Sequence, residues 1–186
     1  MKGHILAAAA LAAASLAMSA AQAKAEEFTA KFSGFQETGA LGAGETGAIL
    51  SNGTAKLTLN VNNVAQTATF TLTFSGLSTP ITQSHIHFGR VHTPGNVIVF
   101  FCSNLAGAPA GTQACPQNAT SGTVTGTITA ANVIAVPSQG VPADNFDALT
   151  DALNSNTAYG NIHTTQFPAG EIRGQILIGE LGDFEN

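Results

Sequence analysis

Two segments of the chain alternate strictly between apolar and polar residues. Residues 54–61 place alanine, leucine or valine at every second position, and residues 67–74 do the same with alanine, phenylalanine and leucine. Threonine fills most of the positions between them. A period of two with one polar face is typical of a half-buried strand. Because Asn62-Asn63 offers a turn between the two segments, they predict a β-hairpin within an antiparallel sheet.

Shorter apolar or alternating segments continue along the rest of the chain, separated by glycine, proline, asparagine and serine. Many short strands at this spacing predict an all-β fold, a Greek-key antiparallel β-sandwich or barrel. The further expected strands are residues 28–35, 83–88, 97–101, 123–129, 158–163 and 171–178.

One segment, residues 144–153, has the period of a helix instead. Phe146, Leu149 and Leu153 share one helical face, and Asp144 is placed to cap the first turn. We expect one short helix in a crossover, packed over an end or edge of the strands. A partner-binding helix is the alternative, but one apolar stripe is what a packed helix needs.

The N-terminus has the three parts of a secretory signal. Lys2 supplies the charge, residues 5–18 are apolar apart from one serine, and small residues follow up to Ala25. The apolar run is shorter than the roughly 20 residues of a membrane anchor. We therefore expect a signal peptide at 1–25, one β domain at 26–180 and a tail at 181–186. The mature protein would be secreted or periplasmic.

Charge narrows the range of partners. Removing Lys2 and Lys24 with the signal takes the formal net charge from −5 to −7, and only 9% of the residues are charged. Nucleic acids and anionic membranes both require basic surfaces, so neither is expected as a partner. The partners that remain possible are an extracytoplasmic protein and a metal ion.

Two cysteines, Cys102 and Cys115, lie close together in the expected domain. In an oxidising compartment such a pair forms a disulfide. A thiol pair that binds a metal or acts in redox chemistry is the alternative, but the spacing is not CxxC and the segment between them is turn-like.

Histidines are the strongest candidates for chemistry. His85 and His87 are two residues apart on an expected strand, so both side chains project from the same face. With His163 from another strand they would make a site for one zinc or copper ion, and His92 is an optional fourth ligand.

Polar residues also alternate near the C-terminus, where Glu171, Arg173 and Gln175 share a face. A carboxylate and a guanidinium in a protein with few charges are expected to be paired or hydrogen-bonded. We expect Glu171 to belong to a structural network that fixes the last strand. Arg173 has a second possible role, the attraction of a small anion.

Four motifs carry a family resemblance: residues 32–37 (FSGFQE, ending in Glu37), 84–89 (SHIHFG), 161–164 (NIHT) and 167–175 (FPAGEIRGQ). In this order they resemble the CHRD domain, named from chordin, which bacterial exported proteins carry as a lone domain. The resemblance covers nearly all of the expected mature chain. It implies an immunoglobulin-like or superoxide-dismutase-like β-sandwich. In chordin these domains belong to an extracellular binder of growth factors.

A weaker similarity links the chain to Cu/Zn superoxide dismutase, which also has His-x-His on a strand, a later histidine and an arginine after it. His85, His87, His163 and Arg173 occupy those places. No run of further ligands for a separate zinc lies between His92 and His163, so a two-metal site is not expected.

Three functions follow from the sequence. The first is a non-catalytic extracytoplasmic binding or structural module, and the second is a protein that binds one metal ion through the histidines. The third is a copper-dependent oxidoreductase of the superoxide-dismutase type, in which Arg173 steers the anion. Nucleophilic hydrolysis has little support, because the chain has no Gly-x-Ser-x-Gly motif.

Overall fold

A computed structural model describes residues 25–39 and 47–179. All but Ala25 of the expected signal segment, and all of the expected tail at 181–186, lie outside the described residues. The described strands are β1 (Glu26–Ser33), β2 (Thr54–Asn62), β3 (Thr67–Ser75), β4 (Ile81–Phe88), β5 (Asn96–Ser103), β6 (Gly122–Thr129), β7 (Ala158–Thr164), β8 (Ile172–Gln175) and β9 (Leu177–Ile178). One α-helix, α1 (Phe146–Asn154), and three 3-10 turns, η1 (Gly34–Gln36), η2 (Ala130–Asn132) and η3 (Pro137–Gln139), accompany them in this part of the chain.

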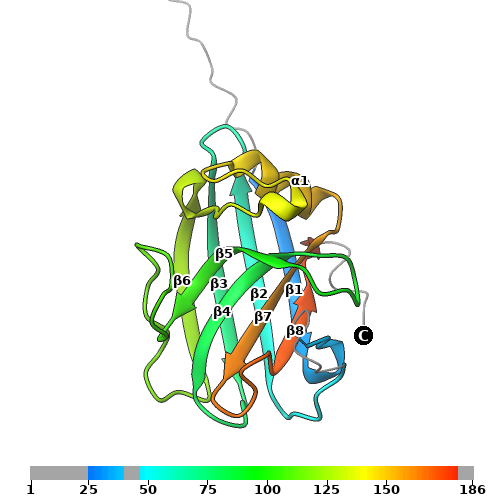
Figure 1. Cartoon of the computed structure of the whole chain (residues 1–186), viewed down its shortest axis with the longest axis vertical. Coiled ribbons are helices and arrows are strands. Elements are labelled where there is room, and N and C mark those ends of the chain that lie inside the picture. Colours follow the sequence, from blue (N-terminus) through cyan, green and yellow to red (C-terminus); the bar gives the residue numbers. More distant parts are fainter. Residues whose placement is uncertain (1–24, 40–46, 180–186) are drawn as a thin grey trace, which may run out of the picture.

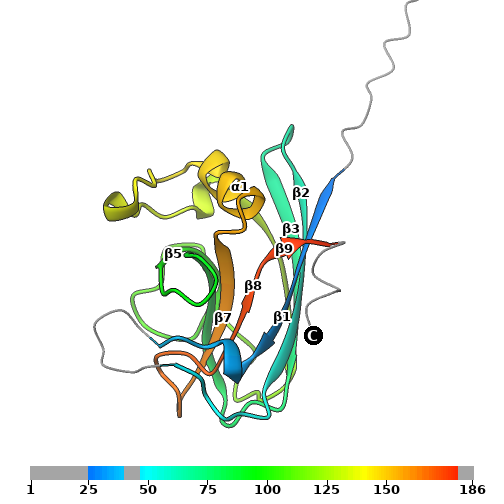
Figure 2. The same ribbon diagram turned by 90° about the vertical axis from the view of Figure 1, so that its right-hand side faces the viewer.

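The strands form one antiparallel sheet that curls into a nearly closed barrel. Its order is β5-β4-β7-β8-β1-β2-β3-β6, with β9 paired to β1. The front layer in Figure 1 holds β5, β4, β7 and β8, and Figure 2 shows β1, β2 and β3 as a second layer behind it. The chain crosses between the layers after β3, after β5, after β6 and again after β8. The expected all-β antiparallel sandwich or barrel is therefore confirmed.

The predicted hairpin is present as β2 and β3. Leu57 lies opposite Leu72, and Leu59 opposite Phe70. All four side chains are buried in the space between the layers, while the threonines between them face outward. The alternation in the sequence therefore predicts correctly which face of this layer is exposed to solvent.

A seam separates the two edge strands, β5 and β6, which are not paired with each other. The side-chain amide of Gln113 bridges it by donating to the carbonyl oxygens of Phe101 at 3.0 Å and Thr125 at 3.1 Å. One amide group thus satisfies an edge carbonyl on each side of the opening.

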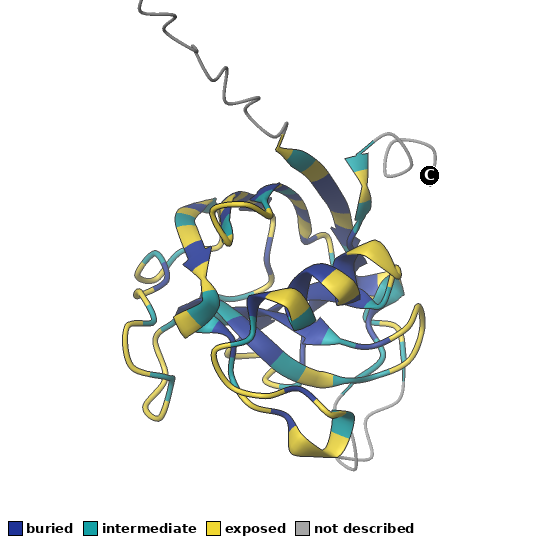
Figure 3. Ribbon diagram, turned by 90° about the horizontal axis from the view of Figure 1, so that it is seen from above, coloured by how far each residue is buried: buried dark blue, intermediate teal, exposed yellow. Residues whose placement is uncertain are grey.

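The helix α1 lies over the top of the barrel in Figure 1, and its buried residues alternate with exposed ones in Figure 3. This confirms the expected short crossover helix. The expected cap is wrong by one residue, because Asn145 accepts the backbone N–H of Ala148 at 3.0 Å. Asp144 has a positive φ of 56° and precedes the cap. In the described part of the chain, no helix is long and apolar enough to cross a membrane.

The last expected strand is divided into two short ones. β8 pairs with β7 and, through Arg173 opposite Ser33, also with β1, whereas β9 pairs with β1. Between them, Ile176 donates its backbone N–H to Ala158. The segment is split because it changes partner as it passes from one layer to the other, which Figure 2 shows.

Cys102 and Cys115 form a disulfide, as expected, and both residues are buried. It ties β5 to the following loop across a sequence separation of 13 residues. Replacing both cysteines with serine should lower the free energy of unfolding by about 3 kcal/mol, because the unfolded chain gains loop entropy. Urea denaturation of the oxidised, reduced and double-mutant proteins measures this. Equal midpoints for the oxidised and reduced proteins would contradict it.

Candidate metal centre

The histidines lie on neighbouring strands, β4 and β7. In the antiparallel register, His85 is opposite Asn161 and Gln83 is opposite His163. His85 and His87 point to the side of the front layer that faces away from the core, because Ile86 between them is fully buried inside. Sequence reasoning therefore placed His85 and His87 correctly on one face, and the strand pairing adds His163 to it.

This outer face is covered by loops, so the histidines are buried as well. His85, His87 and His163 are 3%, 9% and 7% exposed. The loop between β4 and β5 crosses in front of β7 and β8 in Figure 1. A polar layer enclosed by loops thus lies outside the apolar core of the barrel.

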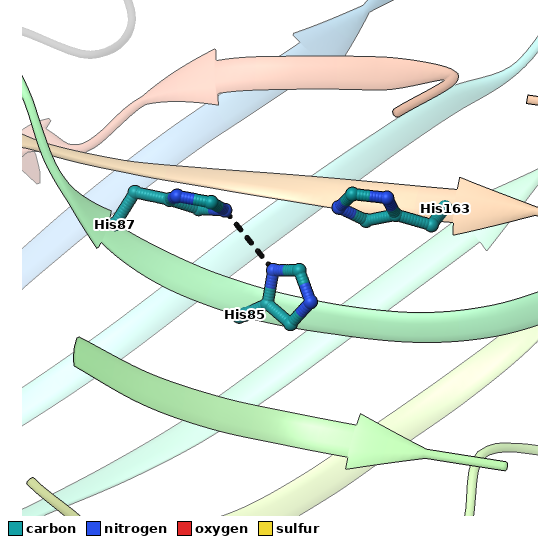
Figure 4. A group of neighbouring side chains, drawn as sticks. All are labelled: His85, His87 and His163. Atoms are coloured by element: carbon teal, nitrogen blue, oxygen red, sulfur yellow. Dashed lines mark hydrogen bonds between the residues drawn. The ribbon is translucent and has the colours of Figure 1, made fainter. Parts of the chain in front are cut away.

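The three imidazoles converge, as Figure 4 shows. One ring nitrogen from each of them lies within 4.8 Å of the other two, and His85 Nδ1 is 3.0 Å from His87 Nε2. Nitrogens that share a tetrahedral zinc ion at about 2.1 Å lie about 3.4 Å apart. Small side-chain movements would therefore suffice for the group to hold one metal ion.

Carbonyl groups from the covering loops fix two of the rings. His87 Nδ1 is 2.9 Å from the carbonyl oxygen of Gly95, and His163 Nδ1 is 2.8 Å from that of Pro168. A carbonyl oxygen can only accept, so both Nδ1 atoms carry the hydrogen and both Nε2 atoms keep a lone pair. Histidine ligands of metals are oriented by such outer hydrogen bonds.

The layer has too few donors for its acceptors. Asn161 Oδ1 lies 3.0 Å from His85 Nδ1 and 3.1 Å from His87 Nε2. Since His87 Nε2 carries no hydrogen, it is an acceptor, as is Asn161 Oδ1. The single hydrogen on His85 Nδ1 is then the one donor shared by these two acceptors. Among the described residues, His163 Nε2 is buried without any hydrogen-bond partner. Lone pairs that meet in a buried space are costly unless a donor or a cation binds them, and these residues therefore fit a cation.

Burial keeps all three imidazoles neutral. It lowers the pKa of His87 to about 4, lowers that of His85 well below its usual value, and lowers that of His163. Neighbouring histidines lower the first two further. A neutral imidazole is the form that binds a metal, so no proton has to leave these rings near pH 7.

Comparison with known protein families identifies the family of this chain. The model of the CHRD domain matches residues 28–176, which is most of the chain. The chain belongs to the CHRD domain family. The comparison with curated proteins and the comparison with solved structures found no match. All three histidines of the centre, with Asn161 and the residues that support them, fall within the matched part of the CHRD domain.

Acid should destabilise the ion-free CHRD domain. An imidazole in the unfolded chain titrates near pH 6.5, whereas the pKa of His87 in the folded domain is about 4. Between these values the unfolded chain binds more protons, so the free energy of unfolding is greatest above about pH 6.5 and falls as the pH falls towards 4. His87 alone accounts for about 3 kcal/mol.

Urea denaturation between about pH 7 and about pH 4, in the presence of a chelator, measures this slope. The His87→Gln variant should show a shallower slope over the same range, because glutamine does not titrate. Equal slopes for the two proteins would contradict the assignment to His87.

An aromatic stack supports His87 from behind. The ring of Tyr159 lies parallel to that of His87, with centroids 4.6 Å apart and an interplanar angle of 6°. The guanidinium carbon of Arg173 lies 3.4 Å from the centre of the Tyr159 ring. The cation therefore binds the outer face of this ring and holds Tyr159 against His87.

Arg173 also fastens the covering loops of the CHRD domain. It is 1% exposed, and its N–H groups donate to Thr38 Oγ1 and to the carbonyl oxygens of Arg90 and Thr93. These bonds engage both of its terminal nitrogens within the protein. The structure places Arg173 as a clamp between two loops rather than at a surface where it would meet a free anion.

His92, the optional fourth ligand, is not brought to the centre. It is exposed in the loop between β4 and β5, with a positive φ of 56°. The group that could hold a metal ion among the described residues contains His85, His87 and His163 without it. The loop turns at His92, and a left-handed position in a turn carries no periodic signal in the sequence.

Glu171 and Arg173 do not bind each other but have separate partners. Glu171 is fully buried and accepts hydrogen bonds from Ser51, Ser78 and Thr164. Gln175 donates to the carbonyl oxygens of Gly89 and Asn156. Both side chains connect the last strands to loops.

Sequence reasoning missed two residues of the centre, Asn161 and Tyr159. Both precede His163 on β7 at intervals of two residues, so they share its face. That spacing was available in the sequence. The contacts with His85 and His87 depend on the pairing of β7 with β4, which is long-range.

Proposed function

We propose that this CHRD domain is an extracytoplasmic module that binds one metal ion, zinc or copper, through His85, His87 and His163. Three neutral imidazoles suit both metals. The signal-like segment 1–25 supports export, and the disulfide supports an oxidising compartment. In such a compartment the ion would be captured from outside the cytoplasm.

The shortage of donors in the buried layer carries this proposal. His87 Nε2 and His163 Nε2 have lone pairs directed into the layer because loop carbonyls hold the hydrogens on the opposite nitrogens. A purely structural role would leave His163 Nε2 buried without a partner, which costs free energy. A bound cation satisfies both nitrogens at once.

The test is metal analysis of the full chain purified from its native export compartment, followed by titration of the chelated protein with zinc and with copper. We expect one equivalent to bind with sub-micromolar affinity and to raise the melting temperature. A protein that is isolated metal-free and takes up neither ion at micromolar concentration would sink the proposal.

Copper-dependent dismutation of superoxide requires the anion to reach the ion. The histidines are enclosed and Arg173 is engaged by loop carbonyls, so we expect the copper-loaded protein to have no dismutase activity above that of a matched protein without copper. Rapid dismutation by the copper-loaded protein would favour the oxidoreductase instead.

A further inference from the structure

A second buried carboxylate, that of Glu37, lies beside the polar layer without a full set of partners. Glu37 is 4% exposed and follows the turn η1. Its Oε1 accepts the backbone N–H of Thr38 at 3.0 Å, whereas its Oε2 has no hydrogen-bond partner in the described part of the chain. A buried carboxylate oxygen without a partner requires an explanation.

The fold makes room for this carboxylate. A Cβ atom placed on Gly170 would come within 2.4 Å of Glu37 Oε2, and Gly170 has a φ of +130°, which only glycine adopts readily. Gly170 lies in the loop between β7 and β8 that includes Pro168, whose carbonyl group orients His163. The same loop thus accommodates Glu37 and positions a metal ligand.

Glu37 is linked to the histidines through Asn161. Burial raises the pKa of Glu37, while the Thr38 backbone, Arg173, the Gly39 backbone and the Asn161 side chain lower it by favouring the charged form. The amide oxygen of Asn161 contacts His85 and His87. The Asn161 side chain therefore neighbours both the centre and the carboxylate.

The charges of the layer show what Glu37 can contribute. The three candidate ligands are neutral, so a divalent ion would bring two positive charges into a buried space. Glu171 is saturated by donors from Ser51, Ser78 and Thr164. The charge of Arg173 is solvated by the oxygens of Thr38, Arg90 and Thr93. Among the described residues, Glu37 is the buried carboxylate that still has an oxygen without a hydrogen-bond partner.

We propose that Glu37 is the charge-compensating residue of the metal centre and that it makes the centre selective for a divalent ion, Zn²⁺ or Cu²⁺, over monovalent Cu⁺. This inference rests on the proposed function, because it assumes that the histidines bind an ion. Glu37 is a positioning and selectivity residue, and it acts across Asn161 rather than as a ligand.

Coulomb's law gives the inference a sharp form. The attraction between a carboxylate and an ion is proportional to the charge of the ion, whatever their separation and the local dielectric. Removing the charge of Glu37 must therefore change the logarithm of the affinity for Zn²⁺ twice as much as that for Cu⁺. For a residue just outside the ligands, the loss of Zn²⁺ affinity is about 10- to 100-fold, so the loss for Cu⁺ is about 3- to 10-fold.

The experiment compares the wild-type chain with Glu37→Gln, which keeps the shape and removes the charge. Zn²⁺ affinity is measured by competition with a chromophoric chelator, and Cu⁺ affinity by the same method without oxygen. Glu27→Gln is the matched control, because Glu27 is exposed on β1, and both of its affinities should equal those of the wild type. Glu37→Asp keeps the charge but moves it, and it provides a second test of the two-to-one relation if Glu37→Gln does not fold.

Losses in the ratio of two to one on the logarithmic scale support the inference. Equal losses for the two ions show that Glu37 is merely structural and overturn it, and so do unchanged affinities in Glu37→Gln. If the wild-type chain binds neither ion, the proposed function fails and the inference fails with it. The two failures are distinguishable, because only the failure of the proposed function abolishes binding by the wild-type protein.

Discussion

Replacing His163 with alanine is expected to lower the zinc affinity of the CHRD domain by about a hundredfold to a thousandfold. The ring supplies one of three converging nitrogens, and it is the one whose lone pair has no partner among the described residues. Zinc sites with four ligands are worth about 10–16 kcal/mol, so one ligand contributes about 2.5–4 kcal/mol. The loss of one ligand therefore corresponds to a factor of about 10² to 10³.

Competition with a chelator of known affinity measures this loss, and the melting temperature of the chelated variant shows whether the fold survives. His92→Ala is the matched control, because His92 is an exposed histidine of the same domain that lies outside the group. Its zinc affinity should equal that of the wild type. If His92→Ala lost affinity and His163→Ala retained it, the assignment of the ligands would be wrong.

The second large effect concerns stability and involves Glu171. This side chain is fully buried, and its two oxygens accept hydrogen bonds from Ser51, Ser78 and Thr164. Glu171→Ala would leave the buried Thr164 hydroxyl without its acceptor, and it would also remove the acceptor of the half-buried Ser51 hydroxyl and of two donors of the exposed Ser78. We expect the free energy of unfolding to fall by about 3 kcal/mol, because a buried donor left unsatisfied costs about 1–3 kcal/mol and the other hydrogen bonds are lost with it.

Urea denaturation at neutral pH measures this change. Glu171→Gln keeps one acceptor oxygen in place. Its free energy of unfolding should fall by roughly half as much as that of Glu171→Ala, because most of the donors bind Oε1. If Glu171→Ala unfolded at the same urea concentration as the wild type, the network would have no part in holding the last strand to the loops.

Local patterns in the sequence were enough to predict those elements whose partners are close along the chain. The β2–β3 hairpin follows from period two alone, because its threonines face water and its leucines face the core. The break at Ile176 has no such signal, since Ile172, Ile176 and Ile178 are all apolar. It depends on the transfer of the chain from β7 to β1, which only the assembled sheet determines.

The candidate centre also has one part that local sequence patterns predict and another that depends on the assembled fold. The shared face of His85 and His87 follows from their spacing of two residues, whereas the addition of His163 requires a register between strands about 80 residues apart. The orientation of the rings depends on the carbonyl groups of Gly95 and Pro168, which belong to loops. Every residue has a backbone carbonyl group, so the sequence does not indicate which of them accept these hydrogen bonds.

The placement of the polar layer outside the barrel has a consequence for assembly. The apolar core lies between the two layers and involves none of the three histidines, so the chain can complete its folding before any metal arrives. Small zinc domains differ, because their folding and metal capture are a single event. If the proposed ion binds at this outer face, it can be gained or released without disturbing the apolar core. Such a protein would suit the exchange of metal with its surroundings, with the barrel as a permanent scaffold.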